Sequence, residues 1–158
     1  MRKKLYEQTK KERKIEEESW NEWFSGFTKK IAKKEASNSK GKKRGFVYLI
    51  ECGGYFKIGR AKNMKRRISE MQGGNPFQIN LICYSFFKDD VYTERILHKS
   101  FFTERVVSGK NREWFVLSDF FLKQVRKMIM LGSQFYSIAN PTSFVSNLEP
   151  RRRYSKRC

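Results

Sequence analysis

The apolar residues follow a different period in each part of the chain. In residues 1–36 they recur every three or four positions, the spacing of one helix face, at Trp20, Trp23, Phe24, Phe27 and Ile31. This pattern predicts a long amphipathic helix. Its apolar face can dock on the core of the domain or on a second copy of the chain. A nucleic-acid-binding arm and a helix on a membrane surface are the alternatives.

Residues 37–44 are small, polar and basic, and we expect a linker there. From residue 45 the apolar positions form two short runs that meet at Gly53–Gly54, which predicts a hairpin with a two-residue turn. That turn pairs Tyr48 with Gly59 and brings Tyr48 diagonal to Lys57 on the same face. Because glycine has no side chain, we expect a hollow between the phenol and the ammonium.

A short amphipathic helix is predicted directly after the hairpin. Asn63 can cap its N-terminus, and Gly73–Gly74 can end it. Arg67 lies on the flank of the apolar stripe, so it can reach back over the hairpin, whereas Lys65 and Arg66 point toward solvent.

The next segments predict a third strand and another helix. Residues 79–86 have the composition of a strand. Asp89–Asp90 then opens a helix in which Glu94 and His98 share a face. After a loop, residues 111–117 read as a short extended segment that packs against the edge of the sheet.

The last predicted helix covers residues 118–132, with Ser118 as its cap and Gly132 as its stop. Residues 133–158 carry few signals of ordered structure and end in a basic run. We therefore expect a basic C-terminal tail.

The charge of the chain is strongly positive. Its 35 Lys and Arg residues outnumber 16 Asp and Glu residues, which gives a formal charge of +19. Residues 1–44 hold 15 basic and 7 acidic residues, and residues 120–158 hold 8 and 1. Such a balance is typical of proteins that bind a polyanion, so nucleic acid is the expected partner.

Several classes of protein are excluded or disfavoured by the sequence. The three cysteines form no Cys-x-x-Cys pair, and with a single histidine they make no zinc site of familiar spacing. The chain lacks the P-loop and Gly-x-Ser-x-Gly motifs. No apolar run has the length of a signal-peptide core or a membrane span. We expect a cytoplasmic or nuclear protein that is neither secreted nor inserted in a membrane.

Five short motifs within residues 45–118 together resemble the GIY-YIG nuclease superfamily. In chain order they are GFVYLI, FKIG, NMKRRI, TERILHKSF and EWFVL. The second motif reads Lys-Ile-Gly, as in the phage and virus branch of the phage T5 open-reading-frame type. Most other members have a tyrosine at the position of Lys57. The resemblance implies an α+β domain over residues 45–132, with a small three-stranded antiparallel sheet flanked by helices.

The resemblance also implies an activity and a set of roles. It implies a DNA endonuclease that hydrolyses phosphodiester bonds with one divalent metal, Mg²⁺ or Mn²⁺. Tyr48 would orient or deprotonate the attacking water. Lys57 and Arg67 would stabilise charge on the phosphate oxygens, and Glu94 would bind the metal. His98, on the helix face of Glu94, is a further candidate for the site.

Basic residues around the hairpin and in the tail are the expected contacts to DNA. They are Arg60, Lys62, Lys65, Arg66, Arg151, Arg152 and Arg153.

Each candidate site residue also has an ordinary structural interpretation. Tyr48 and Lys57 can be simple strand residues, Arg67 and Glu94 can pair with neighbouring charges, and His98 can be a structural hydrogen-bonder. The chain as a whole can be a nucleic-acid-binding or packaging protein that keeps the nuclease fold with little or no catalysis. In a third interpretation, the helix over Trp20–Ile31 docks on another copy or on a larger particle.

Overall fold

The computed structural model describes residues 2–37, 44–106 and 113–139. The elements in chain order are α1 (Arg2–Ala36), β1 (Gly45–Cys52), β2 (Tyr55–Ala61), α2 (Met64–Gly73), β3 (Asn80–Phe87), α3 (Asp90–Ser100), a 3₁₀ turn η1 (Phe102–Glu104), β4 (Trp114–Phe115) and α4 (Asp119–Ala139). The predicted α+β class is confirmed. Most of the predicted linker and tail, including Arg151, Arg152 and Arg153, lies outside the described residues.

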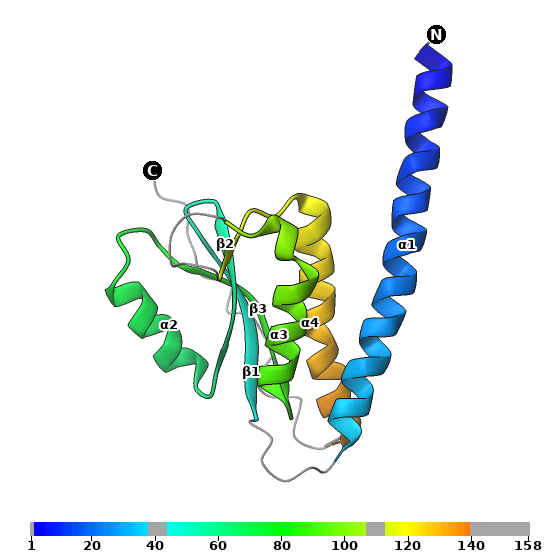
Figure 1. Cartoon of the computed structure of the whole chain (residues 1–158). Helices are drawn as coiled ribbons and strands as arrows, with labels where there is room; N and C mark the ends of the chain where they lie inside the picture. Colours follow the sequence, from blue (N-terminus) through cyan, green and yellow to red (C-terminus); the bar gives the residue numbers. More distant parts are fainter. Residues whose placement is uncertain (1, 38–43, 107–112, 140–158) are drawn as a thin grey trace.

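The elements form layers around one antiparallel sheet with the strand order β3-β1-β2-β4. Figure 1 shows α2 on one face of the sheet, α3 and α4 on the other face, and α1 outside α4. Because β1 lies between two strands and two helix layers, its residues alternate between two cores. Val47 and Leu49 face α3 and α4, whereas Tyr48 and Ile50 pack on the side of α2.

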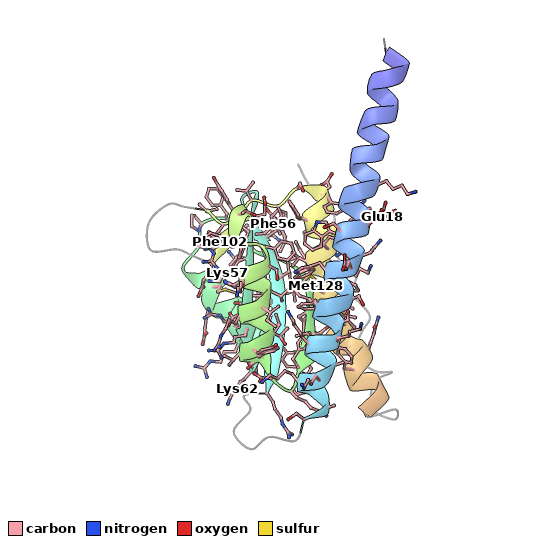
Figure 2. The ribbon with its side chains drawn as sticks, turned by 45° about the vertical axis from the view of Figure 1, so that its right-hand side comes forward. Glu18, Phe56, Lys57, Lys62, Phe102 and Met128 are labelled. Atoms are coloured by element: carbon pink, nitrogen blue, oxygen red, sulfur yellow. The ribbon has the colours of Figure 1, made fainter. Side chains whose placement is uncertain are left out.

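Buried apolar side chains occupy the space between the sheet and its helices. Met128 of α4 is fully buried in this layer, while Glu18 and Lys62 lie exposed at the periphery (Figure 2). None of the described helices combines the length and the hydropathy that a bilayer span requires.

The C-terminal half of α1 is part of the domain core. Phe27 and Ile31 are buried in the same cluster as residues of α3 and α4. Trp20 stacks on Phe101 with ring centroids 5.7 Å apart. The backbone amide of Lys88 donates to the buried carboxylate of Glu35 at 2.9 Å. The aromatic stripe therefore docks on the chain's own core, as the first of the interpretations above proposed.

The hairpin has the predicted register. Tyr48 pairs with Gly59 and Ile50 pairs with Lys57. Gly53 and Gly54 have φ angles of 58° and 85°, in the left-handed region that a two-residue primed turn requires and that only glycine adopts without strain.

The sheet has one more strand than the three predicted. β4 is only two residues long and pairs with β2, so that Phe115 lies beside Phe56 and Trp114 beside Lys57. A strand this short has no periodic pattern of its own. The predicted extended segment does lie at the sheet edge, but as an additional strand.

The predicted end of the last helix at Gly132 is wrong, because α4 continues to Ala139. A β-carbon at residue 132 would lie 2.7 Å from the carbonyl oxygen of Phe86 and from the ring of Phe87. The glycine therefore allows α4 to approach β3 closely, and it does not act as a stop. Ser118 is the N-terminal cap, as predicted, since its Oγ accepts from the amide of Phe121 at 3.4 Å.

We predict that Ile31→Ala lowers the free energy of unfolding by about 2–5 kcal/mol, because it leaves a cavity where a fully buried side chain packs. Urea denaturation measures this change. Lys30→Ala, at the exposed neighbouring position of the same helix, should alter stability by at most about 0.5 kcal/mol. Equal stability of both variants would contradict the docking of α1.

Candidate active site

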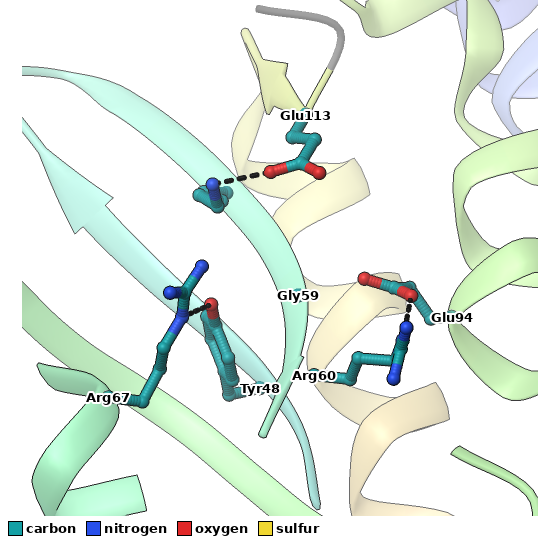
Figure 3. A pocket seen from close by; sticks show the side chains of 7 residues that line it. Tyr48, Gly59, Arg60, Arg67, Glu94 and Glu113 are labelled. Atoms are coloured by element: carbon teal, nitrogen blue, oxygen red, sulfur yellow. Dashed lines mark hydrogen bonds and ion pairs between the residues drawn. The ribbon is translucent and has the colours of Figure 1, made fainter. Parts of the chain in front are cut away.

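A cavity of about 280 Å³ opens beside the middle of β2. Seven residues line it: Tyr48, Lys57, Gly59, Arg60, Arg67, Glu94 and Glu113. They come from β1, β2, α2, α3 and the residue just before β4. Figure 3 shows Tyr48 and Arg67 on one side of Gly59, with Arg60 and Glu94 on the other.

The phenol of Tyr48 is placed by a glycine on the neighbouring strand. A β-carbon on residue 59 would lie 2.5 Å from the Tyr48 hydroxyl oxygen and 2.6 Å from its Cζ. No side chain other than glycine's hydrogen fits this approach. Position 59 requires glycine because the tyrosine ring occupies the space of a side chain, and not because of the backbone conformation there.

Arg67 covers the Tyr48 hydroxyl from the side of α2. Asn63 caps α2 by accepting from the amide of Arg66 at 2.9 Å, and this start of the helix directs Arg67 back over the hairpin. Its Nε donates to the phenol oxygen at 3.3 Å, and this hydrogen bond raises the pKa of Arg67, so the guanidinium stays charged. Tyr48 has no exposed surface, and its hydroxyl also donates to Sδ of Met71 at 3.7 Å, so a ligand in the cavity reaches the hydroxyl only if the side chains that cover it move, Arg67 among them.

Lys57 forms an ion pair with Glu113 at the β4 side of the cavity. Its Nζ lies 2.5 Å from Oε2 of Glu113, and 12% of the Lys57 side chain is exposed. The hydrogen bond from Lys57 is the main reason that the pKa of Glu113 is lowered. The ammonium also lies 5.7 Å from the centre of the Trp114 ring.

Glu94 projects from α3 toward the same cavity and pairs with Arg60. Nε of Arg60 donates to Oε2 of Glu94 at 2.9 Å, and in Figure 3 the second carboxylate oxygen points toward the cavity. Burial raises the pKa of Glu94 above its usual value, while His98 and Arg60 oppose that rise. The site therefore holds a partly desolvated carboxylate whose charge is balanced by one arginine.

The structure brings together four of the five residues predicted for the site. His98 does not line the cavity. Its Nε2 donates to the carbonyl of Ile58 at 2.9 Å, and its Nδ1 accepts from Arg105 at 3.3 Å. His98 thus connects α3 to the back of β2, and its contacts match the structural interpretation that the sequence left open.

The predicted DNA contacts fall into different places. Lys62, Lys65 and Arg66 are exposed on the segment that leads from β2 into α2, and Arg66 pairs with Glu70 at 2.7 Å. Arg60 lines the cavity beside Glu94, so it is a residue of the site itself.

Two acidic residues near the cavity were not expected from the sequence. Glu113 reaches the cavity because β4 pairs with β2. The only indication of this pairing in the sequence was the extended Glu-Trp-Phe segment predicted at the sheet edge. Asp90 lies one helical turn before Glu94, and its Oδ2 is 4.0 Å from Nη1 of Arg60. The sequence indicated only that Asp90 begins a helix.

The described residues contain no group of three or more His, Cys, Asp or Glu side chains that could hold a metal ion. A divalent cation at this cavity would have Glu94 as its protein ligand and take the rest from water and phosphate. Mg²⁺ and Mn²⁺ accept such a set, because Mg²⁺ keeps several waters when one or two carboxylates bind it. The carboxylate oxygen that points into the cavity fits this requirement.

We predict that Gly59→Ala destabilises the protein by about 1–3 kcal/mol, because the added carbon overlaps the Tyr48 ring. Gly26→Ala is the matched control. Gly26 lies within α1 with nothing within 4 Å of the added carbon, so the same substitution should stabilise by about 0.5–1 kcal/mol. Urea denaturation of both variants checks the pair, and a stable Gly59→Ala protein would contradict the packing described.

We also predict opposite pH effects at the two cavity carboxylates. The pKa of Glu94 is raised in the folded state, so its contribution to stability falls as the pH rises above the usual 4.5. The pKa of Glu113 is lowered, so its contribution is present at neutral pH and is lost in acid.

Glu94→Gln should therefore raise the free energy of unfolding at about pH 7, and Glu113→Gln should lower it. Both differences should shrink as the pH falls to about 3, because Glu94 is then protonated in the folded and unfolded states and Glu113 is protonated in the unfolded state. Denaturation curves at the two pH values measure this. A loss of stability in Glu94→Gln at neutral pH that persists in acid would count against a desolvated carboxylate.

Comparison with known proteins identifies the domain that carries the cavity. The model of the T5orf172 domain, a phage-associated domain with a nuclease-like context, matches residues 45–131, which are more than half of the chain. No curated protein and no solved structure matches the chain. The matched segment contains every residue that lines the cavity. The chain belongs to the T5orf172 domain family.

Proposed function

We propose that this protein is a metal-dependent DNA endonuclease of the GIY-YIG type, which hydrolyses phosphodiester bonds. One observation carries the proposal: Tyr48, Lys57, Arg67 and Glu94 come from four different elements and converge on one cavity. The nuclease-like context of the T5orf172 family supports it.

The chain's own residues supply distinct parts of the chemistry. The Tyr48 oxygen orients the attacking water, once the incoming phosphate has drawn Arg67 away from it, or it removes a proton from that water after the phenol's own proton has passed to solvent. Arg67 and Lys57 place positive charge where the non-bridging phosphate oxygens gain negative charge in the transition state. Removal of water from the cavity by the DNA strengthens both interactions.

Glu94 would hold the divalent metal, Mg²⁺ or Mn²⁺. When bound, the metal supplies charge neutralisation at the leaving oxygen of the phosphate. Without the metal, Glu94 already presents one carboxylate oxygen toward the cavity, and its other oxygen accepts from Arg60.

DNA reaches the cavity along a positively charged approach. Lys62, Lys65 and Arg66 are exposed next to the start of α2, which also carries Arg67 over Tyr48. Together with the charge of +19, they provide affinity for the phosphate backbone that does not depend on sequence and weakens with salt.

A second candidate function is nucleic-acid binding or packaging without cleavage. The observation in its favour is that Lys57 and Arg60 are each paired with a carboxylate of the chain itself, Glu113 and Glu94. In the folded protein these pairs offset the charge of both cations, so a phosphate meets them only by exchanging partners. The two functions differ in one respect that can be measured: only the first converts supercoiled DNA to nicked DNA.

We predict that Glu94→Ala abolishes metal-dependent nicking of supercoiled plasmid and that Tyr48→Phe slows it by roughly 10²-fold or more, the size expected for loss of general acid–base catalysis. Both rates are measured with Mg²⁺, Mn²⁺ and chelator.

Matched controls separate these effects from general damage. Glu17→Ala removes an exposed carboxylate on α1, and Tyr55→Phe removes an exposed hydroxyl at the hairpin turn. Both should cleave as the wild type does. Cleavage at the wild-type rate by Glu94→Ala and Tyr48→Phe would refute the proposal, and tight salt-dependent binding without cleavage under any condition would favour the second function.

A further inference from the structure

Two acidic residues of α3 face one arginine of β2. Asp90 and Glu94 are one helical turn apart, and both lie next to the guanidinium of Arg60. In the structure Arg60 is bound to Glu94, with Nε 2.9 Å from Oε2. The distance from Nη1 to Oδ2 of Asp90 is 4.0 Å, which is beyond a hydrogen bond but close enough for attraction.

Asp90 is buried and incompletely bonded. Its relative exposure is 1%, and its Oδ1 is a buried oxygen with no hydrogen-bond partner among the described residues. Such an oxygen costs free energy, so the burial of this carboxylate calls for a reason other than stability.

The first sequence motif, GFVYLI, begins with the glycine that makes room for Asp90. A β-carbon on Gly45 would lie 2.5 Å from Oδ2 of Asp90 and 3.0 Å from the carbonyl oxygen of Ala61. The glycine at the start of β1 therefore makes room for this carboxylate, as Gly59 makes room for the phenol of Tyr48.

Glu94 cannot serve Arg60 and a divalent cation equally well. The guanidinium and the metal repel each other, and each attracts the same carboxylate. The Arg60 side chain is 40% exposed, so it can change position without disturbing the core. A displacement of about 1 Å toward Asp90 would bring Nη1 into hydrogen-bond distance of Oδ2.

We propose that Asp90 is a positioning residue that accepts Arg60 when Glu94 binds its cation. Arg60 then neutralises Asp90 instead of Glu94, and the carboxylate at the cavity becomes free to bind the metal. Asp90 is not among the residues that line the cavity, so it acts through Arg60 and not as a ligand. This proposal rests on the metal site of the proposed function, and the experiment below separates the two.

The test is Mn²⁺ binding to the full-length protein without DNA. Binding is measured as the loss of the free Mn²⁺ signal in electron paramagnetic resonance. Asp90→Asn should weaken Mn²⁺ binding about tenfold, because Arg60 then stays on Glu94. Arg60→Ala should bind Mn²⁺ more tightly than the wild type. In the Arg60→Ala background, Asp90→Asn should change the affinity by less than about twofold, because no arginine remains to be moved.

Two further variants keep the test decisive. Asp119→Asn is the matched control: Asp119 is the first residue of α4, as Asp90 is of α3, but it is exposed, and its loss should leave Mn²⁺ affinity unchanged. Gly45→Ala displaces the Asp90 carboxylate without removing its charge. It should weaken Mn²⁺ binding when Arg60 is present and leave it nearly unchanged in the Arg60→Ala background. It replaces Asp90→Asn if that variant does not fold.

Each outcome has one meaning. An equal loss of affinity from Asp90→Asn with and without Arg60 shows that Asp90 acts by its own charge and overturns the proposal, as does no loss in either background. Unchanged Mn²⁺ binding in Glu94→Ala instead overturns the metal site of the proposed function.

Discussion

Tyr48 and Gly59 face each other across β1 and β2 so closely that a β-carbon on residue 59 would overlap the phenol. The hairpin turn sets this pairing, and the pairing sets the place of the hydroxyl beneath Arg67. The phenol fills the space of the missing side chain at position 59, and a hollow remains beside it between Lys57 and Arg60, where the cavity lies. The remaining elements bring charged groups to the rim of this hollow.

Two of the cationic side chains that line the cavity are paired with carboxylates of the protein before any ligand arrives. Lys57 is paired with Glu113, and Arg60 is paired with Glu94. In the proposed reaction, the phosphate and the metal would exchange these partners, and the pairs seen here would be the resting arrangement of the site. Burial raises the pKa of Glu94, because the charged carboxylate is less favourable there than in water. The charge of Glu94 is therefore held at a cost to stability. Such a cost is common where function, and not stability, requires the group.

Local signals explain what could be predicted from the sequence. The turn at Gly53–Gly54 fixed the register of the hairpin, and the cap of α2 fixed the direction of Arg67. Long-range packing explains the rest. Glu113 reaches the cavity only because a two-residue strand pairs with β2, and that strand has no period to detect. Asp90 is buried because Gly45 leaves room for it, and Gly132 packs against β3 where a helix stop was predicted.

The most direct test of the account is the chemical nature of the DNA ends that the wild-type protein leaves. Supercoiled plasmid is incubated with the protein and Mg²⁺ or Mn²⁺, and the product is then treated with DNA ligase. We expect nicks with a 5′-phosphate and a 3′-hydroxyl, as attack by water at this site would leave, so ligase should restore closed circles. An absence of nicking with either metal, or nicks that ligase cannot seal, would contradict the account.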